Sequence, residues 1–304
     1  MLKRLFIAAI AMLLLLVPAL SLCEAPDAGC VINLIENPDA QYAFDPDAQL
    51  LEIIFPRIFS SDCSFIRFGE ETMLIDSSTE SEEMHARIRE AIELVGIDHF
   101  DIAYNSHPHR DHIMGFPIIH EYAPFKKFLI TFPADFDWRM RKIVRIMEDD
   151  GVPVEQIGDG DHLSLGANGE VSIRMIQRNV NPSWPVNDRS AMLFITYGDR
   201  TFLMSGDNES RSQKYFAETL PEGSLKADIL KYPHHGHAPM MVEFRAAVDP
   251  QLCITTGAAN VMKDMKKHFE EIGMPYLIAY QGITRMRTDG KIWVVDRLQD
   301  APTE

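Results

Sequence analysis

The stretch Asn105-Ser106-His107-Pro108-His109-Arg110-Asp111-His112 decides the fold and the chemistry that we expect of this chain. It places three histidines and one aspartate within six residues, and imidazole and carboxylate are ligands that zinc and similar divalent ions prefer. His107 and His109 alternate, so both can point to one side of an extended loop, while Asp111 and His112 form a second pair. The stretch directly follows an apolar run typical of a strand, and sites often assemble in loops at strand ends. We therefore expect a metal site here and not a solvated, histidine-rich surface loop.

Two later stretches carry related chemistry. Lys231-Tyr232-Pro233-His234-His235-Gly236-His237 also follows a short apolar strand, and the two clusters together hold six of the eleven histidines of the chain. Between them, Ser205-Gly206-Asp207 ends another apolar strand. A Gly-Asp pair alone is usually a turn, but its place between two histidine clusters makes Asp207 a candidate carboxylate bridging two metal ions.

The hydrophobic pattern predicts many short strands with a few amphipathic helices between them. The predicted strands are residues 50–55, 65–68, 73–75, 100–104, 128–132, 171–176, 192–197, 202–205, 283–287 and 292–295. One helix has an apolar face from Met84 to Val95, and Thr79 with Glu82 forms the pattern of a capping box before it. Further helices are predicted at residues 135–149 and 262–272. Strict alternation of strand and helix is absent, which favours two sheets with helices outside over one doubly wound sheet.

The order of these clusters is similar to that of a known family. His107-x-His109-x-Asp111-His112, followed by Gly-Asp and a late histidine, resembles the signature of the metallo-β-lactamase superfamily. Several segments resemble more closely the soluble hydrolase domain of the DNA-uptake protein ComEC and its stand-alone relatives. These segments are residues 62–66, 73–76, 187–190, 202–207 and 230–236, and the resemblance runs from about residue 48 to residue 297.

The resemblance implies an α/β fold of four layers, the αββα metallo-β-lactamase sandwich, with a binuclear metal site at one edge of its two sheets. Carried over by position, the ligands are His107 and His109 for the first metal, Asp111 and His112 for the second, and Asp207 as the bridge. A late histidine completes the second position. We assign it to His235 and leave His234 to contact substrate or support the ligands, with the reverse assignment open.

One feature departs from many members of the superfamily, which carry another histidine for the first metal between the signature and Gly-Asp. This interval holds only His120 and His162 here, and neither is placed like that ligand. The ComEC-like group resembles this chain in having Asn187 and Ser190 in the segment. We therefore expect a first metal that is weakly held, completed by water or exchangeable. Zinc is the default ion, and manganese is the alternative because the second half of the site is rich in oxygen.

Two adjacent divalent ions can lower the pKa of a bridging water and clamp the attacking and departing oxygens. In such a site Asp111 would orient the nucleophile or accept its proton, and Lys231, His234 and Asn187 would steady charge on an oxyanion. A solvated charge at a strand end is an equal alternative for Lys231. Phosphodiester hydrolysis is the leading hypothesis, because the late His-His-Gly and the segment of Asn187 resemble ComEC-type and phosphocholine-esterase-type members.

Three other functions compete with this hypothesis. β-Lactam or lactone hydrolysis is the runner-up, although the missing histidine weakens the resemblance to true lactamases. A non-catalytic binding module on the same fold is disfavoured by the intact signature. Redox chemistry on a di-iron version of the fold is disfavoured, because the second ligand position is typically Glu in that group and is His109 in this chain.

The N-terminus has the pattern of an export signal. Residues 1–25 combine two basic residues, an apolar run and small residues at its exit, so we expect a cleaved signal peptide, with an uncleaved anchor or a lipoprotein as alternatives. Residues 26–47 are expected to form a linker or arm, and residues 48–304 the hydrolase domain. Cys30 could pair with Cys63 in an oxidising compartment, and Cys253 is expected within a buried strand.

The charge limits the partners that we expect. The chain has 29 Lys plus Arg against 45 Asp plus Glu, a net charge of −16. No Lys/Arg stripe for a phosphate backbone is present, so a small molecule or small phosphodiester is the expected substrate and nucleic acid is disfavoured. No membrane contact is expected beyond the possible N-terminal anchor, and the sequence does not indicate an oligomeric state.

Overall fold

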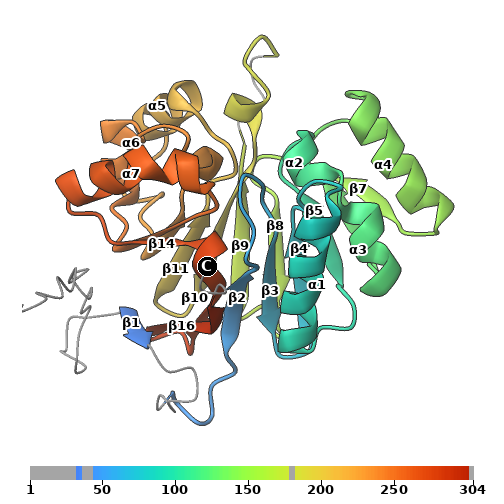
Figure 1. Cartoon of the computed structure of the whole chain (residues 1–304), viewed down its shortest axis with the longest axis horizontal. Helices are drawn as coiled ribbons and strands as arrows, with labels where there is room; N and C mark the ends of the chain where they lie inside the picture. The colour runs from blue at the N-terminus through green and yellow to red at the C-terminus, as the bar shows by residue number, and fades with distance from the viewer. Residues whose placement is uncertain (1–31, 36–43, 178–181, 301–304) are drawn as a thin grey trace, which may run out of the picture.

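A computed structural model describes residues 32–35, 44–177 and 182–300, and within them two β-sheets pack face to face (Figure 1). The first sheet is built from β1 (Ile32–Ile35), β2 (Leu51–Phe55), β3 (Ser64–Phe68), β4 (Glu71–Ile75), β5 (Ile102–Asn105), β6 (Phe128–Ile130), β7 (Val154–Gln156), β15 (Gly282–Thr288) and β16 (Trp293–Asp300). The second is built from β8 (His162–Leu165), β9 (Val171–Ile176), β10 (Met192–Tyr197), β11 (Arg200–Met204), β12 (Ile229–Lys231), β13 (Leu252–Thr255) and β14 (Tyr276–Ile278). The strand orders are β1-β16-β15-β2-β3-β4-β5-β6-β7 and β14-β13-β12-β11-β10-β9-β8.

Helices cover the outer face of each sheet, on opposite sides of the molecule in Figure 1. The first sheet carries α1 (Glu82–Val95), α2 (Arg110–Ile113), α3 (Phe116–Tyr122) and α4 (Trp138–Asp149). The second carries α5 (Ser210–Thr219), α6 (Val242–Val248) and α7 (Ala259–Glu271). This arrangement confirms the expected four-layer αββα sandwich.

Both faces of the central strands are buried, which explains why their sequences are apolar at consecutive positions. In β2, Ile53 packs in the core between the two sheets, whereas its neighbour Ile54 packs under the helices of the first sheet. Aromatic contacts join the two sheets, since the ring of Phe202 lies 6.2 Å from that of Phe55 and 6.2 Å from that of Trp293. The strands therefore form a rigid base for the loops at their ends.

The direction of pairing brings the chemistry to one edge. In the first sheet β4, β5 and β6 are parallel, and in the second β11, β12 and β13 are parallel. The carboxyl ends of parallel strands lie at the same edge of a sheet, where ligands commonly bind. The residues that follow these ends are Asp76, His107, Asp207, His235 and Thr256.

Several expected boundaries differ from the structure. The capping box is wrong: α1 begins at Glu82 after Ser81, no side chain caps it, and the Thr79 hydroxyl instead accepts a hydrogen bond from the Ser81 amide (3.2 Å). The helix expected at residues 135–149 begins at Trp138, because Asp137 caps it by accepting from the Met140 amide. The helix expected at residues 262–272 is α7, which begins three residues earlier.

The segment expected to be an arm contributes a strand. Within residues 26–47, β1 pairs in parallel with β16, and Ile32 is buried between the sheets. The Pro- and Asp-rich surroundings of this four-residue strand hide it in the sequence. The predicted signal peptide and Cys30 lie outside the described residues, while Cys63 and Cys253 are buried free thiols, the latter within β13 as expected. Within the described ranges, no helix has the length and apolar character needed to cross a membrane.

Gly115, directly before α3, allows the turn between α2 and α3 to approach α1 and the loop after β4, and its replacement by alanine tests this packing. A Cβ atom there would lie 2.0 Å from the Ser77 carbonyl oxygen and 2.6 Å from His85 Cε1. We expect Gly115→Ala to lower the free energy of unfolding by about 1–3 kcal/mol in urea titrations. Gly158→Ala is the control, because a Cβ at Gly158 meets no atom within 4 Å. Equal stability of the two variants would contradict the account.

Candidate metal centre

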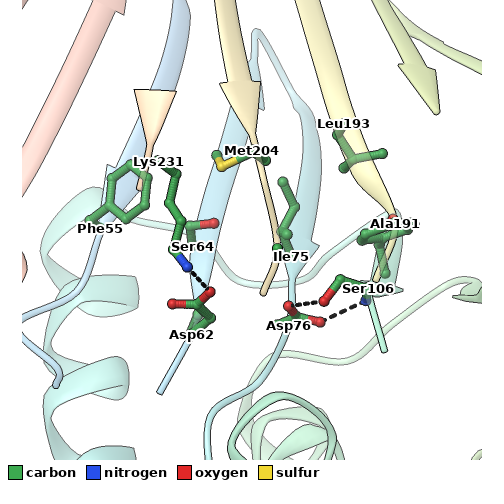
Figure 2. Close-up of a pocket in the computed structure, with 13 residues that line it drawn as sticks. Phe55, Asp62, Ser64, Ile75, Asp76, Ser106, Ala191, Leu193, Met204 and Lys231 are labelled. Atoms are coloured by element: carbon green, nitrogen blue, oxygen red, sulfur yellow. Dashed lines mark hydrogen bonds and ion pairs between the residues drawn. The ribbon is translucent and has the colours of Figure 1, made fainter. Parts of the chain in front are cut away.

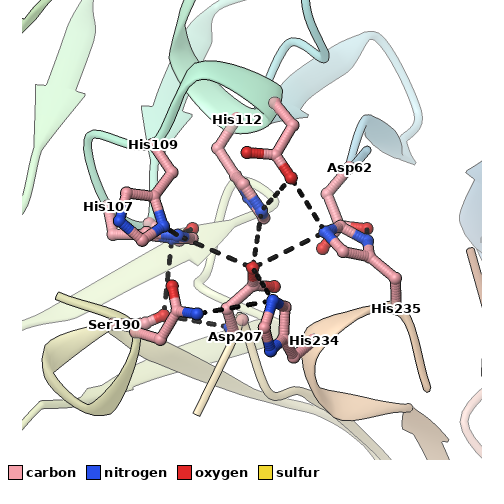
Figure 3. A network of polar contacts seen from close by, with 12 residues as sticks. Asp62, His107, His109, His112, Ser190, Asp207, His234 and His235 are labelled. Carbon is pink, nitrogen blue, oxygen red and sulfur yellow. Dashed lines mark hydrogen bonds and ion pairs between the residues drawn. The ribbon is translucent and has the colours of Figure 1, made fainter. Parts of the chain in front are cut away.

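Asp207 is the centre of the candidate site. Its Oδ2 lies 3.1 Å from Nε2 of His112, 3.5 Å from Nε2 of His235, 3.7 Å from Nε2 of His107 and 3.8 Å from Nε2 of His234 (Figure 3). The side chain is 1% exposed, and Oδ1 is buried with no hydrogen-bond partner in the described part of the chain. A buried carboxylate with an unpartnered oxygen, surrounded by imidazole nitrogens, is a donor set that fits divalent metal ions.

One group of candidate ligands gathers on the α2 side of Asp207, where the second metal is expected. Nε2 of His235 lies 3.1 Å from Oδ2 of Asp111, and Nε2 of His112 lies 3.8 Å from the same oxygen. Asp62 also lies close enough to His112, Asp207 and His235 to be a ligand. However, Asp62 contacts Nδ1 of His235, on the ring side opposite Nε2. Asp111 is therefore the better candidate ligand, and Asp62 supports the histidine from behind.

The first metal position has fewer donors. Nε2 of His107 lies 3.1 Å from Nδ1 of His109, and the two residues lie close enough to Asp207 to share a metal ion with it. Neither His120 nor His162 joins them: His120 accepts a hydrogen bond from the Phe125 amide, and His162 begins β8. This position has three candidate ligands among the described residues, which fits the expected weak first metal.

Two buried aspartates fix which nitrogen of each histidine faces the site. Asp76 Oδ2 lies 2.8 Å from Nδ1 of His112, and Asp62 Oδ1 lies 3.2 Å from Nδ1 of His235. A carboxylate at Nδ1 holds a proton there, so when the imidazole is neutral its Nε2 lone pair faces the cluster. Asp76 is in turn held by the Ser106 amide and hydroxyl, at 2.8 and 2.6 Å.

The two late histidines point in different directions because the backbone between them turns sharply. His234 and His235 both adopt left-handed conformations (φ 45° and 53°), which are rare for residues other than glycine and concentrate at functional sites. His235 is buried against the ligands, whereas His234 is 30% exposed and its Nδ1 lies 3.0 Å from Glu209. This placement supports His235 as the ligand and His234 at the open side.

The other expected site residues lie around the cluster. Asn187, in a short 3₁₀ helix (Asn187–Arg189), donates from Nδ2 to Glu209 (2.8 Å) and lies 3.4 Å from Nε2 of His234. Ser190 Oγ accepts from the Asp207 amide (3.0 Å) and contacts Nδ1 of His107 (3.5 Å). Lys231 is buried and paired with Asp62, so the alternative of a solvated charge is wrong.

Sequence reasoning missed four supporting residues, namely Asp62, Asp76, Glu209 and Thr256. Asp62 and Asp76 lie in segments that carry the family resemblance, and Asp76 directly follows a strand, so a signal was present without a role attached to it. Glu209 and Thr256 carried no signal, because their function depends on neighbours brought close only by folding.

The charges of the cluster shift in opposite directions. Burial alone would lower the pKa of His112 and His235, but Asp207 and their supporting aspartates raise the pKa of His112 well above its usual range and that of His235 to about 10. Burial and neighbouring His112 lower the pKa of His107 and His109. Despite its burial, the pKa of Asp207 is held well below its usual range by His112 and His235. In the metal-free site, the negative charge of the carboxylates is therefore balanced by protonated His112 and His235 on the α2 side.

This charge balance predicts how the stability of the metal-free protein depends on pH. The raised pKa values mean that the folded protein retains protons which an unfolded chain releases near pH 6.5. The stabilisation is complete below that pH and is lost as the pH rises toward about 10. We expect Tm of the metal-free protein to fall between pH 7 and 10, and to fall less with zinc bound, because the metal replaces the protons. A flat or rising Tm without metal would contradict the assignment.

Comparisons with known proteins identify the family of the chain. The metallo-beta-lactamase superfamily model matches residues 56–239, more than half of the chain. No curated protein matches. Among solved structures, a mutant of CmlA beta-hydroxylase is similar with a TM-score of 0.51 and 14% identity, over 81% of this chain and 54% of that one, so the chain spans about half the length of that protein.

Two further solved structures are similar at low identity. The metallo-beta-lactamase fold protein YhfI from Bacillus subtilis has a TM-score of 0.49 and 14% identity, over 75% of this chain and 96% of that one. A diphosphatase from the PhnP family has a TM-score of 0.45 and 12% identity, over 74% and 94%. Since the family model spans the histidine signature, Asp207 and His235, this chain belongs to the metallo-β-lactamase superfamily.

Proposed function

We propose that the chain is an exported, metal-dependent hydrolase that acts on a small phosphodiester with two divalent ions, zinc by default and manganese as the alternative. The observation that carries this proposal is the position of Asp207, whose Oδ2 lies between a His107/His109 group and an Asp111/His112/His235 group. A carboxylate shared by two ligand groups is the arrangement that two-metal hydrolases require. The superfamily consists mainly of metal-dependent hydrolases, which supports an enzyme.

The exposed side of the cluster defines where a substrate would approach. The Asp111 and His234 side chains are 31% and 30% exposed, whereas those of Asp207 and His235 are 1% exposed. When bound, the ions would supply Lewis acidity and a water of lowered pKa. Asp111 would then accept the proton of the attacking water, and His234 with Asn187 would donate hydrogen bonds to the oxygens of the substrate.

Residues of this chain also favour the phosphodiester over a cyclic amide or ester. Ser190 contacts both Asp207 and His107, and the segment that holds Asn187 and Ser190 resembles the ComEC-like group, which supports that assignment. The net charge of −16 favours a small diester over a nucleic acid, whose backbone requires clustered cations. The signal-like residues 1–25 are the reason to place the enzyme outside the cytoplasm.

The unequal ligand groups predict two-step metal loading. We expect zinc titrated into metal-free protein to bind with a stoichiometry of two, first tightly at the His112/His235 position and then more weakly at the His107/His109 position. Calorimetry with elemental analysis measures both steps. His109→Ala should remove only the weak step, and His235→Ala should weaken the tight one. A single metal per chain, or two equal affinities, would be inconsistent with this site.

Turnover of chromogenic substrates separates the candidate activities. We expect the zinc- or manganese-loaded protein to hydrolyse bis-p-nitrophenyl phosphate, and Asp207→Asn to reduce kcat/KM by at least about 100-fold because it removes the shared anionic ligand. Glu222→Gln, an exposed change outside the cluster, is the control and should leave turnover unchanged. Turnover of nitrocefin without diester hydrolysis would replace the phosphodiester with a β-lactam, and neither activity in a metal-loaded protein would favour a binding module.

A further inference from the structure

Lys231 lies beneath the cluster and not at its open side. It is the last residue of β12, its side chain is 4% exposed, and its ammonium binds the carboxylate of Asp62 (Figure 2). The two residues line a small cavity between the sheets whose walls include Phe55, Ile75 and Met204. A lysine buried among such residues is costly unless an opposite charge compensates it. Asp62 provides the one ion pair of Lys231 recorded in the described ranges.

The other oxygen of Asp62 faces His235. Asp62 Oδ1 accepts a hydrogen bond from the Thr256 hydroxyl (2.6 Å) and lies 3.2 Å from Nδ1 of His235. The Thr256 hydroxyl is also 2.8 Å from the same nitrogen. Asp62 therefore divides its two oxygens between Lys231 and His235, and these contacts orient the His235 ring from the side opposite Asp207.

His112 provides an internal contrast. Its supporting carboxylate, Asp76, is held by neutral donors from Ser106 and Asn105, and no lysine or arginine pairs with it among the described residues. Asp62 differs because its main ion pair is with a lysine that has no access to the open side of the cluster. Lys231 is buried, and its ammonium pairs with the carboxylate that holds the His235 ring. A substrate that approaches past Asp111 and His234 would therefore not contact Lys231 directly.

We propose that Lys231 is a positioning residue that acts through Asp62 to hold His235 with Nε2 toward the metal position. This inference rests on the proposed metal site, and it replaces the expected role of Lys231 as a stabiliser of oxyanion charge. Without the ammonium, Asp62 would carry an uncompensated buried charge and would turn toward other donors. The His235 ring would then lose its orientation, so the tight metal position would weaken while the His107/His109 position would not.

The test compares zinc and cobalt binding in four variants. Lys231→Met should weaken the tight step by about 10- to 100-fold and change the visible spectrum of cobalt bound there, with the weaker step unchanged. Lys231→Arg should restore most of the affinity. The double variant Asp62→Asn with Lys231→Met removes both charges and keeps an oxygen that can accept from His235. It should therefore bind zinc more tightly than Lys231→Met does. It also keeps the inference testable if that single variant does not fold. Lys226→Met, an exposed lysine paired with Asp249, is the matched control.

The outcomes separate this inference from the proposed function. Tight zinc binding unchanged in Lys231→Met, with a loss confined to kcat for the diester, would overturn the inference and restore the oxyanion role. A wild-type protein that binds no zinc would overturn the metal site and this inference with it. If the wild-type protein hydrolyses no diester but Lys231→Met shows the predicted loss of zinc affinity, only the proposed substrate would be refuted. Zinc affinity is measured with the metal alone and does not depend on the substrate.

Discussion

The burial of the Asp207 carboxylate is the constraint on which the rest of the structure depends. An isolated carboxylate away from water is costly, so cationic groups must surround it in every state of the folded protein. Without metal, protonated His112 and His235 supply that charge, and the pKa shifts of all three groups follow from their contact. Divalent ions can replace those protons, so metal binding and proton release are thermodynamically coupled.

The sheets bring this charge cluster together from distant parts of the chain. Ends of parallel strands deliver Asp76 and His107 from the first sheet, and Asp207, His235 and Thr256 from the second. Residues with left-handed backbones collect at the same edge, including Ser60, Asp76, Ser78, His234 and His235. Such conformations cost energy in side-chain-bearing residues, and the close packing of the two sheets between their helices compensates for that cost.

Much of the fold was predictable because its signals are local. The αββα layers, the strands at residues 171–176 and 192–197, and the order of the histidine clusters follow from pattern and resemblance, and the structure has β9 and β10 with those bounds. The start of α4 depends on which nearby carboxylate caps it, and Asp137 does so by accepting from the Met140 amide. β1 depends on a pairing with β16 at the far end of the chain, so no local signal marks it.

The inner contacts of the site were less predictable than its ligands. Histidine spacing marks ligands, whereas the support of His235 by Asp62 and Thr256 joins residues far apart in sequence. Lys231 is a second example. Its place beside a histidine cluster in the sequence is compatible with a solvated charge or with a catalytic group. Only the packing of β12 between its neighbouring strands shows that Lys231 lies beneath the ligands.

Anomalous diffraction from crystals soaked in zinc tests the central role of Asp207 most directly. The account predicts two peaks about 3.5–4 Å apart, one on each side of the Asp207 carboxylate, with the stronger beside His112 and His235. A single peak away from Asp207, or a metal bound by Asp62 on the Nδ1 side of His235, would contradict it.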